Sequence, residues 1–430
     1  MKTIIIFNGI ISVLFAICYV YQFFYVLVGI RKKATIKQTQ KNHRYGVVIS
    51  ARNESCVIGN LIESIKNQNY PRELIDIFVI ADNCTDNTAD IARKAGATVY
   101  ERFDTELIGK GYALNWFFEN MVTNSEPDTY DGFFVFDADN VLDTNFVAEM
   151  NKVFDSGYRI ITSYRNSKNY SENWITAGYS LWFLREARFS NNPRMQLNTS
   201  CAISGTGFLI STEILRKLGG WVHHLLTEDI EFTVSNIIDG EHIGYCATAI
   251  LYDEQPNTFR QSYLQRLRWA KGFYQVFYHY GKRLIKGVFR GSFSCYDILM
   301  TIMPAMLLTC ISTAVNLVSI PYGIITASPE LLPLVKTLLQ TLWGFYMIFF
   351  ALGGATTIAE WKQIHCCTLK KIGYVFTFPL FMLTYVPISI IALFKKVHWA
   401  PISHTVSKTL ADICEENEHK NTHSDNGIQA

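Results

Sequence analysis

The strongest constraint on the fold of this chain is a regular alternation of short apolar runs and helical stretches. Apolar runs lie at residues 46–50, 76–81, 98–100 and 132–136. Runs of this length fit buried strands that are covered on both faces. Stretches with helical apolar spacing lie between them, at 57–67, 90–95 and 114–122. Strands that alternate with helices imply right-handed crossovers, so we expect an α/β fold with a mostly parallel sheet.

Polar and acidic residues follow three of these predicted strands directly. Asn53 and Glu54 follow the first strand, Asp82 follows the second, and Asp137 and Asp139 follow the fourth. The carboxyl ends of parallel strands meet at one edge of a sheet, and folds of this class bind their ligands there. We therefore expect these five side chains to line one binding site.

The first apolar segment, residues 4–30, carries no charged side chain and is long enough to span a bilayer. It runs directly into Arg31, Lys32 and Lys33, without the small-residue cleavage site of a signal peptide. We predict a retained anchor whose basic C-terminal end faces the cytoplasm. The lack of other targeting signals suggests a bacterial inner or plasma membrane.

Further apolar stretches lie towards the C-terminus, at 295–318, 331–351 and 373–394. The first two predict membrane spans, joined by an external loop without Lys or Arg. A simple crossing of the third stretch would put Lys395 and Lys396 outside, against the tendency of basic residues to stay inside. Because Pro379 and Pro387 interrupt this stretch, we hypothesise a bent or re-entrant element, with a tail that remains cytosolic.

These patterns divide the chain into an anchor, a cytosolic α/β domain, an amphipathic segment, a membrane region and a tail. We place them at 1–33, 45–258, 259–292, 293–396 and 397–430. The amphipathic segment mixes aromatic with basic residues and lacks a long apolar core, as helices at a membrane surface do. A helix packed on the α/β domain is the alternative.

Charge and cysteine usage exclude two classes of site. The formal net charge is only +2, so the chain lacks the strong positive charge that is typical of nucleic-acid-binding proteins. The ten cysteines are scattered, and no two pairs have the spacing of zinc ligands. We therefore expect buried, reduced thiols in a cytosolic domain.

Asp137 and Asp139 form an Asp-x-Asp pattern directly after an apolar run. Hard Mg²⁺ or Mn²⁺ prefers oxygen ligands and takes the remainder from phosphates and water, so we predict a metal ion that bridges a diphosphate. A loop cap is the plain alternative. Asp82 could accept hydrogen bonds from the imide edge of uracil. Lys110, between two glycines, could contact the diphosphate, although a solvated lysine fits the same pattern.

The triplet Thr227-Glu228-Asp229 offers a candidate general base. The Asp229 carboxylate could take the proton of an acceptor hydroxyl as that hydroxyl attacks a sugar carbon. If the hydroxyl attacks from the face opposite the diphosphate, the configuration at that carbon is inverted. Glu228 would support the base from the neighbouring position, and an acidic helix start is the alternative interpretation of the triplet.

Gln265, Arg268 and Trp269 share one helix face because they are spaced i, i+3, i+4. A Trp side chain can stack on a sugar ring, and an Arg side chain can pair with a diphosphate through two hydrogen bonds. A Trp in an interfacial belt is the alternative. The three residues predict a flat acceptor floor beside the membrane.

In combination, these motifs resemble those of family 2 glycosyltransferases. The resemblance is specifically to the processive membrane synthases of cellulose, mixed-linkage glucan, chitin, hyaluronan and poly-N-acetylglucosamine. It covers residues 47–269 and implies a GT-A fold for 45–258, with Mg²⁺ or Mn²⁺ as cofactor. By motif match it implies that Asp82 holds uridine, that Asp137 and Asp139 hold the diphosphate and the metal, and that Asp229 is the base of the T-E-D triplet.

The same resemblance assigns the remaining site residues. It places Gln265, Arg268 and Trp269 in a Q-x-x-R-W motif at the acceptor and donor entrance. Gly205-Thr206-Gly207 matches a small-residue segment that lines the acceptor terminus. Trp399 resembles a C-terminal Trp that closes over the nucleotide in some members. On the donor side, these assignments are joined by Asn53, Glu54 and Lys110.

We therefore expect an inverting, processive glycosyltransferase that polymerises a UDP-sugar into a β-linked glucan and passes it across the membrane, with UDP-glucose as the leading donor. The alternatives are a synthase of an N-acetylglucosamine polymer and an enzyme that adds one or a few sugars to a membrane lipid. A binding module without catalysis is a third class, against which the intact Asp139, Asp229 and Trp269 argue. The short membrane region leaves room for a homo-oligomer or a partner subunit.

Overall fold

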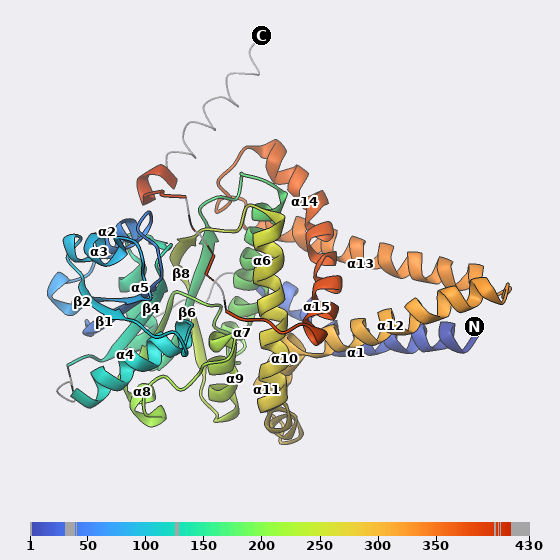
Figure 1. Cartoon of the computed structure of the whole chain (residues 1–430), viewed down its shortest axis with the longest axis horizontal. Coiled ribbons are helices and arrows are strands. Elements are labelled where there is room, and N and C mark those ends of the chain that lie inside the picture. Colours follow the sequence, from blue (N-terminus) through green and yellow to red (C-terminus); the bar gives the residue numbers. More distant parts are fainter. Residues whose placement is uncertain are drawn as a thin grey trace, which may run out of the picture.

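The computed structural model describes residues 2–30, 39, 41–124, 129–399, 401–402, 404 and 406–413. An α/β domain forms one end of the molecule, and apolar helices project from it as an arm (Figure 1). The strands predicted from the sequence before residue 140 are all present. They are followed by further strands that the apolar runs did not indicate.

The α/β domain is built on an eight-stranded sheet with the order β3-β2-β1-β4-β7-β6-β8-β5. The strands are β1 Tyr45–Ala51, β2 Ile75–Asp82, β3 Thr98–Arg102, β4 Gly132–Asp137, β5 Val141–Leu142, β6 Ile160–Ser167, β7 Phe208–Ser211 and β8 Ile243–Asp253. Strands β1, β2, β3 and β4 are parallel to one another, as predicted.

The prediction of a mostly parallel sheet is wrong, because the second half of the sheet is mixed. Strand β7 is antiparallel to both β4 and β6, and β5 is antiparallel to β8, while β6 and β8 are parallel. The alternation of strand and helix on which the prediction rested stops at β4. A helical segment, residues 174–196, lies between β6 and β7, yet β7 returns antiparallel beside β6, so a helix between two strands does not by itself make them parallel.

Helices cover both faces of the sheet. They are α2 Ile58–Lys66, α3 Thr88–Lys94, α4 Lys110–Asn124, α5 Phe146–Asp155, α6 Trp174–Glu186, α7 Asn192–Gln196, α8 Thr212–Leu218 and α9 Glu228–Ile238, with short turns η1 Arg72–Leu74 and η2 Ala187–Asn191. On β1, Val47 and Val48 point to opposite faces and are both fully buried. Burial on both sides is why the strands read as unbroken apolar runs.

The remaining helices form the region predicted to meet a membrane. They are α1 Lys2–Ile30, α10 Phe259–Phe289, α11 Phe293–Ile302, α12 Pro304–Ile325, α13 Leu331–Ala359, α14 Thr368–Leu383 and α15 Tyr385–Phe394. Among the described residues, four stretches are long and apolar enough to cross a membrane. These are 2–30, 293–325, 331–359 and 368–394.

The apolar helices fall into two groups. Helices α1, α12 and α13 lie side by side and form the arm that projects from the α/β domain (Figure 1). Helices α14 and α15 instead run across the base of the arm, where they pack against α6, α10 and α13. The segment predicted as bent is thus two helices with a break at Thr384.

Arg266 holds this break in place. Its side chain is 2% exposed, and its Nη1 donates to the Phe381 carbonyl oxygen at 3.1 Å and to the Thr384 Oγ1 at 2.7 Å. The carbonyl groups at the end of a helix have no partner within that helix. Arg266 therefore caps α14 from within α10, and it ties the catalytic side of the molecule to the helical base.

A buried ion pair fixes the anchor to the domain. Arg194 pairs with Asp297 on α11 through two hydrogen bonds of 2.7 and 2.9 Å. The hydroxyl groups of Tyr21 and Tyr25 on α1 donate to the same carboxylate at 2.8 Å each. The cysteines in the described ranges are free, as predicted, but only Cys201, Cys246 and Cys295 are buried, while Cys56 and Cys367 are exposed.

Candidate functional site

The Asp-x-Asp pair lies where the sequence predicted it, at the carboxyl end of β4. Lys110, the first residue of α4, donates from Nζ to the Asp137 carboxylate at 2.5 Å and to the Gly205 carbonyl oxygen at 2.8 Å. Burial alone would lower the pKa of Lys110, but the charges of Asp137 and Glu228 raise it above the usual value. Lys110 is therefore a fixed cation at the predicted diphosphate position, and not a solvated lysine.

Asp139 is buried against the C-terminal segment. Its Oδ2 accepts the Glu254 backbone N–H at 2.9 Å, and the His404 Nε2 lies 4.0 Å from the same oxygen. The other ring nitrogen of His404, Nδ1, lies 2.9 Å from Glu54. Burial lowers the pKa of His404, but Asp139 and Glu54 outweigh it and raise that pKa to about 10. His404 thus joins the end of β1 to the end of β4.

Two basic side chains of β6 and the loop after it face the same carboxylates. Arg165 pairs with Asp253 through Nε at 2.5 Å. Lys168 is 3% exposed, and its Nζ has no hydrogen-bond partner among the described residues. Burial lowers the pKa of Lys168, while the charges of Asp139 and Glu254 oppose that shift. A buried amine without a partner is rare, and it indicates a place where an anion binds.

The residues predicted to bind the nucleotide lie at the carboxyl ends of β1 and β2. Asp82 is buried, and its Oδ1 accepts from Arg102 at 2.6 Å and from Asn83 at 3.2 Å. Burial raises the pKa of the Asp82 carboxyl, and the Arg102 charge opposes that shift. Asn53 has a positive φ of 58° and accepts the Thr85 backbone N–H at 2.7 Å. No pattern in the sequence indicated that Arg102 would pair with Asp82.

Glu228 and Asp229 begin helix α9, where the helix dipole favours negative charge. Burial, followed by the adjacent Asp229 charge, raises the pKa of Glu228 to about 7. Burial also raises the pKa of Asp229, against the effects of Lys110 and Arg268. The acidic helix start is therefore real, but both carboxyls are perturbed in the way that a proton-accepting pair requires.

The segment Gly205-Thr206-Gly207 lies between the Asp-x-Asp pair and the acidic triplet. Gly205 and Gly207 have positive φ values of 79° and 67°. A Cβ on Gly207 would lie 1.8 Å from the Leu251 side chain, so only glycine fits. Thr206 Oγ1 accepts the Asp137 backbone N–H at 2.9 Å. The segment is thus a rigid floor between the two groups of carboxylates.

Gln265, Arg268 and Trp269 lie on one face of α10, as predicted. The Trp269 ring makes T-shaped contacts with Tyr179 at 5.8 Å and with Phe183 at 6.2 Å, both on α6. The Oε1 of Gln265 is shielded from solvent and has no partner among the described residues. Arg268 lies near enough to Glu228 and Asp229 for its charge to lower the pKa of both.

Helix α10 packs directly against the acidic triplet. A Cβ on Gly272 would lie 2.5 Å from the Thr227 side chain, so the lack of a side chain at 272 lets α10 approach the triplet this closely. One turn further along, the Gln275 Oε1 accepts the Leu226 backbone N–H at 3.3 Å. The base and the acceptor face therefore belong to one packed unit.

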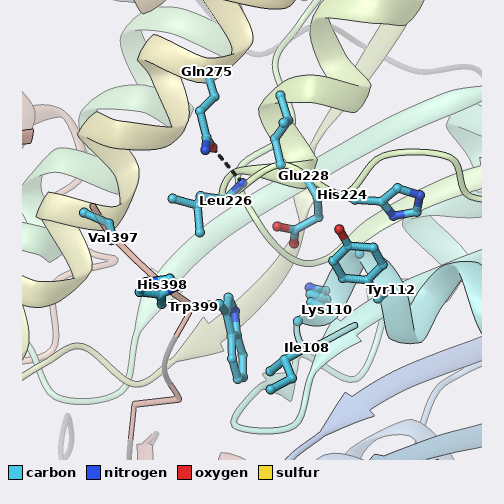
Figure 2. Close-up of a pocket in the computed structure, with 13 residues that line it drawn as sticks. Ile108, Lys110, Tyr112, His224, Leu226, Glu228, Gln275, Val397, His398 and Trp399 are labelled. Atoms are coloured by element: carbon cyan, nitrogen blue, oxygen red, sulfur yellow. Dashed lines mark hydrogen bonds between the residues drawn. The ribbon is translucent and has the colours of Figure 1, made fainter. Parts of the chain in front are cut away.

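A pocket of about 290 Å³ opens between these elements. Figure 2 shows the Glu228 carboxylate and the Trp399 ring facing the same space, with Lys110 beside them. A Cβ on Gly109 would lie 3.7 Å from the Trp399 ring, and the Arg52 guanidinium lies 5.4 Å from the centre of that ring. Trp399 thus lines the pocket, and its closure over a nucleotide stays a prediction.

Sequence reasoning missed three cations of the site: Arg165, Lys168 and His404. Arg165 and Lys168 stand at the end of the run 160–163, where basic residues after a strand could have drawn attention. His404 belongs to the Trp-Ala-Pro-Ile-Ser-His stretch that identified Trp399. No local pattern indicated that it would reach Glu54.

The donor set suits a hard divalent cation. The described residues contain no ready-made group of three His, Cys, Asp or Glu side chains around a single point. Asp137 and Asp139 instead supply oxygen atoms on a rigid strand end, beside the imidazole of His404. Such a partial site fits Mg²⁺ or Mn²⁺, which take their remaining ligands from phosphate and water.

Comparison with known proteins agrees with this geometry. The model of the family described as "Glycosyltransferase like family 2" matches residues 43–272. A probable glycosyltransferase, YdaM of Bacillus subtilis, is 27% identical over 53% of this chain and 55% of its own length. A beta-monoglucosyldiacylglycerol synthase of Nostoc is 26% identical over 61% of this chain and 55% of its own length.

A poly-beta-1,6-N-acetyl-D-glucosamine synthase of Staphylococcus epidermidis is 26% identical over 53% of this chain and 54% of its own length. The chain thus spans about half the length of these curated relatives. Among solved structures, a mannosyltransferase from Pyrobaculum calidifontis in complex with GDP-Man and Mn²⁺ superposes with a TM-score of 0.54. It is 14% identical and covers 90% of this chain and 98% of its own, which supports a GT-A-like fold.

Proposed function

The chain belongs to glycosyltransferase family 2, and from this premise we propose that it polymerises a UDP-sugar into a β-linked glucan. One observation carries the proposal. The acceptor face of α10 presents the half-buried Trp269 ring and an unpartnered Gln265 oxygen, and it is packed onto the triplet that holds Asp229. A sugar ring stacked on Trp269 could place a hydroxyl at the base and satisfy Gln265.

In this reaction Asp229 takes the proton of the acceptor hydroxyl as its oxygen attacks the sugar carbon of the donor. The bond from that carbon to the diphosphate breaks, the configuration inverts, and UDP leaves. Lys110 and Arg268 stabilise the negative charge of the leaving diphosphate. A Mg²⁺ or Mn²⁺ ion held by Asp137 and Asp139 would supply further positive charge.

The donor side is assigned by the same logic. Asp82, Asn53 and Glu54 line the carboxyl ends of β1 and β2, where a nucleotide binds in sheets of this kind. We assign the uracil to Asp82. Uracil as the base and glucose as the sugar are parts of the proposal, and pocket shape near Gly205 decides between glucose and N-acetylglucosamine.

The contact between the tail and the α/β domain constrains how many times the chain between them crosses a membrane. His404 contacts Glu54, so the tail and the α/β domain lie on one side of any membrane that the chain crosses. The segment between them must then cross an even number of times. Helices α11–α12 make one crossing and α13 makes the second, so α14–α15 does not cross. This arrangement keeps the tail cytosolic, in line with Lys395 and Lys396.

Helices α14–α15 would therefore lie in the cytosolic leaflet. Their position across the base of the arm in Figure 1 fits this role. Helix α14 exposes an apolar stripe on one face, made of Leu369, Ile372, Phe376 and Leu380. An exposed apolar stripe flanked by lysines is typical of helices that lie in a membrane surface.

The second candidate function is transfer of one or a few sugars to a membrane lipid. The likeness to the glucosyldiacylglycerol synthase of Nostoc favours it. So does the arm, in which α1, α12 and α13 pack directly on one another. A polymer would then need a second copy or a partner subunit to cross the membrane. The third candidate function is the synthesis of an N-acetylglucosamine polymer.

The test is incorporation of radiolabel by purified protein in lipid with Mg²⁺ or Mn²⁺. UDP-glucose, UDP-N-acetylglucosamine and UDP-glucuronate are offered separately. Product from UDP-glucose that stays in the aqueous phase and yields to linkage-specific glucanases supports the proposal. A labelled product that extracts into organic solvent would indicate glycolipid synthesis instead. Incorporation of label from UDP-N-acetylglucosamine alone would show that UDP-glucose is not the donor.

A further inference from the structure

Arg165 makes three directed contacts that no motif of the chain predicts. Its Nε donates to Asp253 at 2.5 Å, its Nη2 pairs with the same carboxylate, and its Nη1 donates to the Ser204 carbonyl oxygen at 2.9 Å. Its Cζ lies 3.7 Å from the centre of the Phe183 ring. The side chain is only 16% exposed, so this planar group is held in one orientation.

The third contact reaches the candidate base through a single peptide group. The carbonyl oxygen that Arg165 holds belongs to Ser204, and the N–H of the same peptide belongs to Gly205. The Gly205 backbone lies against Asp229, since a Cβ on Gly205 would lie 3.9 Å from the Asp229 Oδ2, and it lowers the pKa of the Asp229 carboxyl against the larger effect of burial. A peptide is planar, and its C=O and N–H point in opposite directions. Holding one end therefore aims the other.

Lys110 fixes the next carbonyl group along the chain. Its Nζ donates to the Gly205 carbonyl oxygen at 2.8 Å. Two cations thus hold two consecutive carbonyl groups, and the backbone of Gly205 between them lies beside Asp229. Glycine at 205, with its positive φ, lets the backbone adopt this orientation.

We propose that Arg165 is a positioning residue that holds the Ser204–Gly205 peptide beside Asp229 and so sets the orientation of the base. The role rests on the proposed transfer reaction, and Arg165 itself touches neither the donor nor the acceptor. The contact with Phe183 extends the role to the acceptor floor, since Phe183 packs against Trp269.

The proposed role of Arg165 predicts the direction in which the pH dependence of transfer shifts when Arg165 is replaced. The charged groups that face Asp229 are Glu228, Glu186, Lys110, Arg268 and Arg165. Loss of Arg165 frees the peptide whose backbone lowers the pKa of Asp229, and it takes away a nearby positive charge. Both of these effects raise the pKa of Asp229. The acid limb of the kcat profile should therefore move to higher pH.

The experiment compares Arg165→Met with Arg159→Met in the full-length protein in lipid. Arg159 stands at the other end of the same strand and forms exposed ion pairs with Glu213 and Glu241, so it is a matched control. We expect Arg165→Met to keep UDP–Mn²⁺ affinity by calorimetry and to lose about 10²-fold in kcat, the cost of a misplaced group. The acid limb should move to higher pH, and Arg159→Met should match the wild type.

A double variant, Arg165→Met/Asp253→Asn, guards against misfolding because it leaves no buried carboxylate unpaired. It should bind UDP–Mn²⁺ and show the same shift of the acid limb. A normal kcat, or a lowered kcat with an unmoved acid limb, in a variant that still binds UDP overturns the inference. If the wild-type protein transfers no sugar, the proposed function fails instead, so the two failures are distinguishable.

Discussion

The Nδ1 of His404 lies 2.9 Å from the carboxylate of Glu54, although the two residues are 350 positions apart in the sequence. This contact closes the tail over the end of β1, and it brings the imidazole within 4.0 Å of Asp139. Val406 continues the closure, because its N–H donates to Glu254 at 3.0 Å. The tail is therefore part of the candidate site.

His404→Ala should weaken the response to metal. The imidazole lies 4.0 Å from the Asp139 carboxylate, and loss of a group that orients a metal ligand typically costs roughly 10- to 100-fold in metal affinity. The Mn²⁺ concentration for half-maximal transfer should rise accordingly in chelator-treated protein. His242→Ala removes an exposed histidine and serves as the control. An unchanged Mn²⁺ requirement in His404→Ala would remove His404 from the metal site.

Ser407→Cys should label only from the cytosolic side. Ser407 accepts a hydrogen bond from Asn60 at 2.9 Å, which holds it against the α/β domain. In a background without exposed native cysteines, an impermeant maleimide added to intact cells should not reach it. Ser328→Cys, in the loop between α12 and α13, should label as the positive control. Labelling of Ser407→Cys in intact cells would refute the even number of crossings.

Asp229→Asn should abolish transfer and spare nucleotide binding. The change removes the proton acceptor and keeps the size of the side chain, and loss of a general base costs roughly 10²- to 10⁴-fold in rate. Asp239→Asn, at the other end of α9, alters an exposed pair with Arg283 and is the matched control. Transfer at the normal rate by Asp229→Asn would show that another group takes the proton.

Glu228→Gln should move the acid limb of the kcat profile to lower pH. The two carboxyls titrate as a pair, in which each negative charge raises the pKa of the other. A general base works deprotonated, so kcat falls as the pH drops through the raised pKa of the pair. Removal of one charge lets Asp229 ionise at lower pH. This shift is opposite to the one expected for Arg165→Met, and a shift to higher pH would contradict it.

Gly272→Ala should disturb the fit between α10 and the acidic triplet. The added Cβ would meet Thr227 at 2.5 Å, and overpacking of this kind costs about 1–3 kcal/mol in the free energy of unfolding. Tm and kcat should both fall. Gly344→Ala on α13 meets nothing within 4 Å and should be neutral.

Thr227→Ala should rescue Gly272→Ala. The Thr227 Oγ1 is buried without a hydrogen-bond partner among the described residues, so Thr227→Ala removes the two contacts of 2.5 Å, breaks no bond and leaves only the Thr227 Cβ at 2.9 Å. The two changes should therefore be non-additive. Equal losses in the single and the double variant would show that the contact between α10 and the triplet does not matter.

The first half of the α/β domain could be predicted from the sequence because its strands are buried on both faces. Val47, Val48 and Ile49 are all fully buried, and this leaves an unbroken apolar run. Strand direction is not encoded in such a run. The antiparallel return of β7 therefore escaped a prediction that rested on alternating strands and helices.

The candidate site was predictable where its residues follow strands or share a helix face, as Asp139 and Trp269 do. Arg165 and His404 were missed because their contacts depend on tertiary structure. Arg165 acts through a backbone carbonyl, which has no sequence signature, and His404 acts from a tail that folds back over β1. Both are cations that balance buried carboxylates, and only the folded chain shows which carboxylates these are.

The central claim is that the acceptor face of α10 holds a growing chain. The most direct measurement is the size of the radiolabelled product made from UDP-glucose by purified protein early in the reaction, while most of the donor remains. The account predicts long β-glucan chains from the start, together with unused donor, because the product stays bound on Trp269 between transfers. A product of one or two sugars on a lipid at every time point would contradict it.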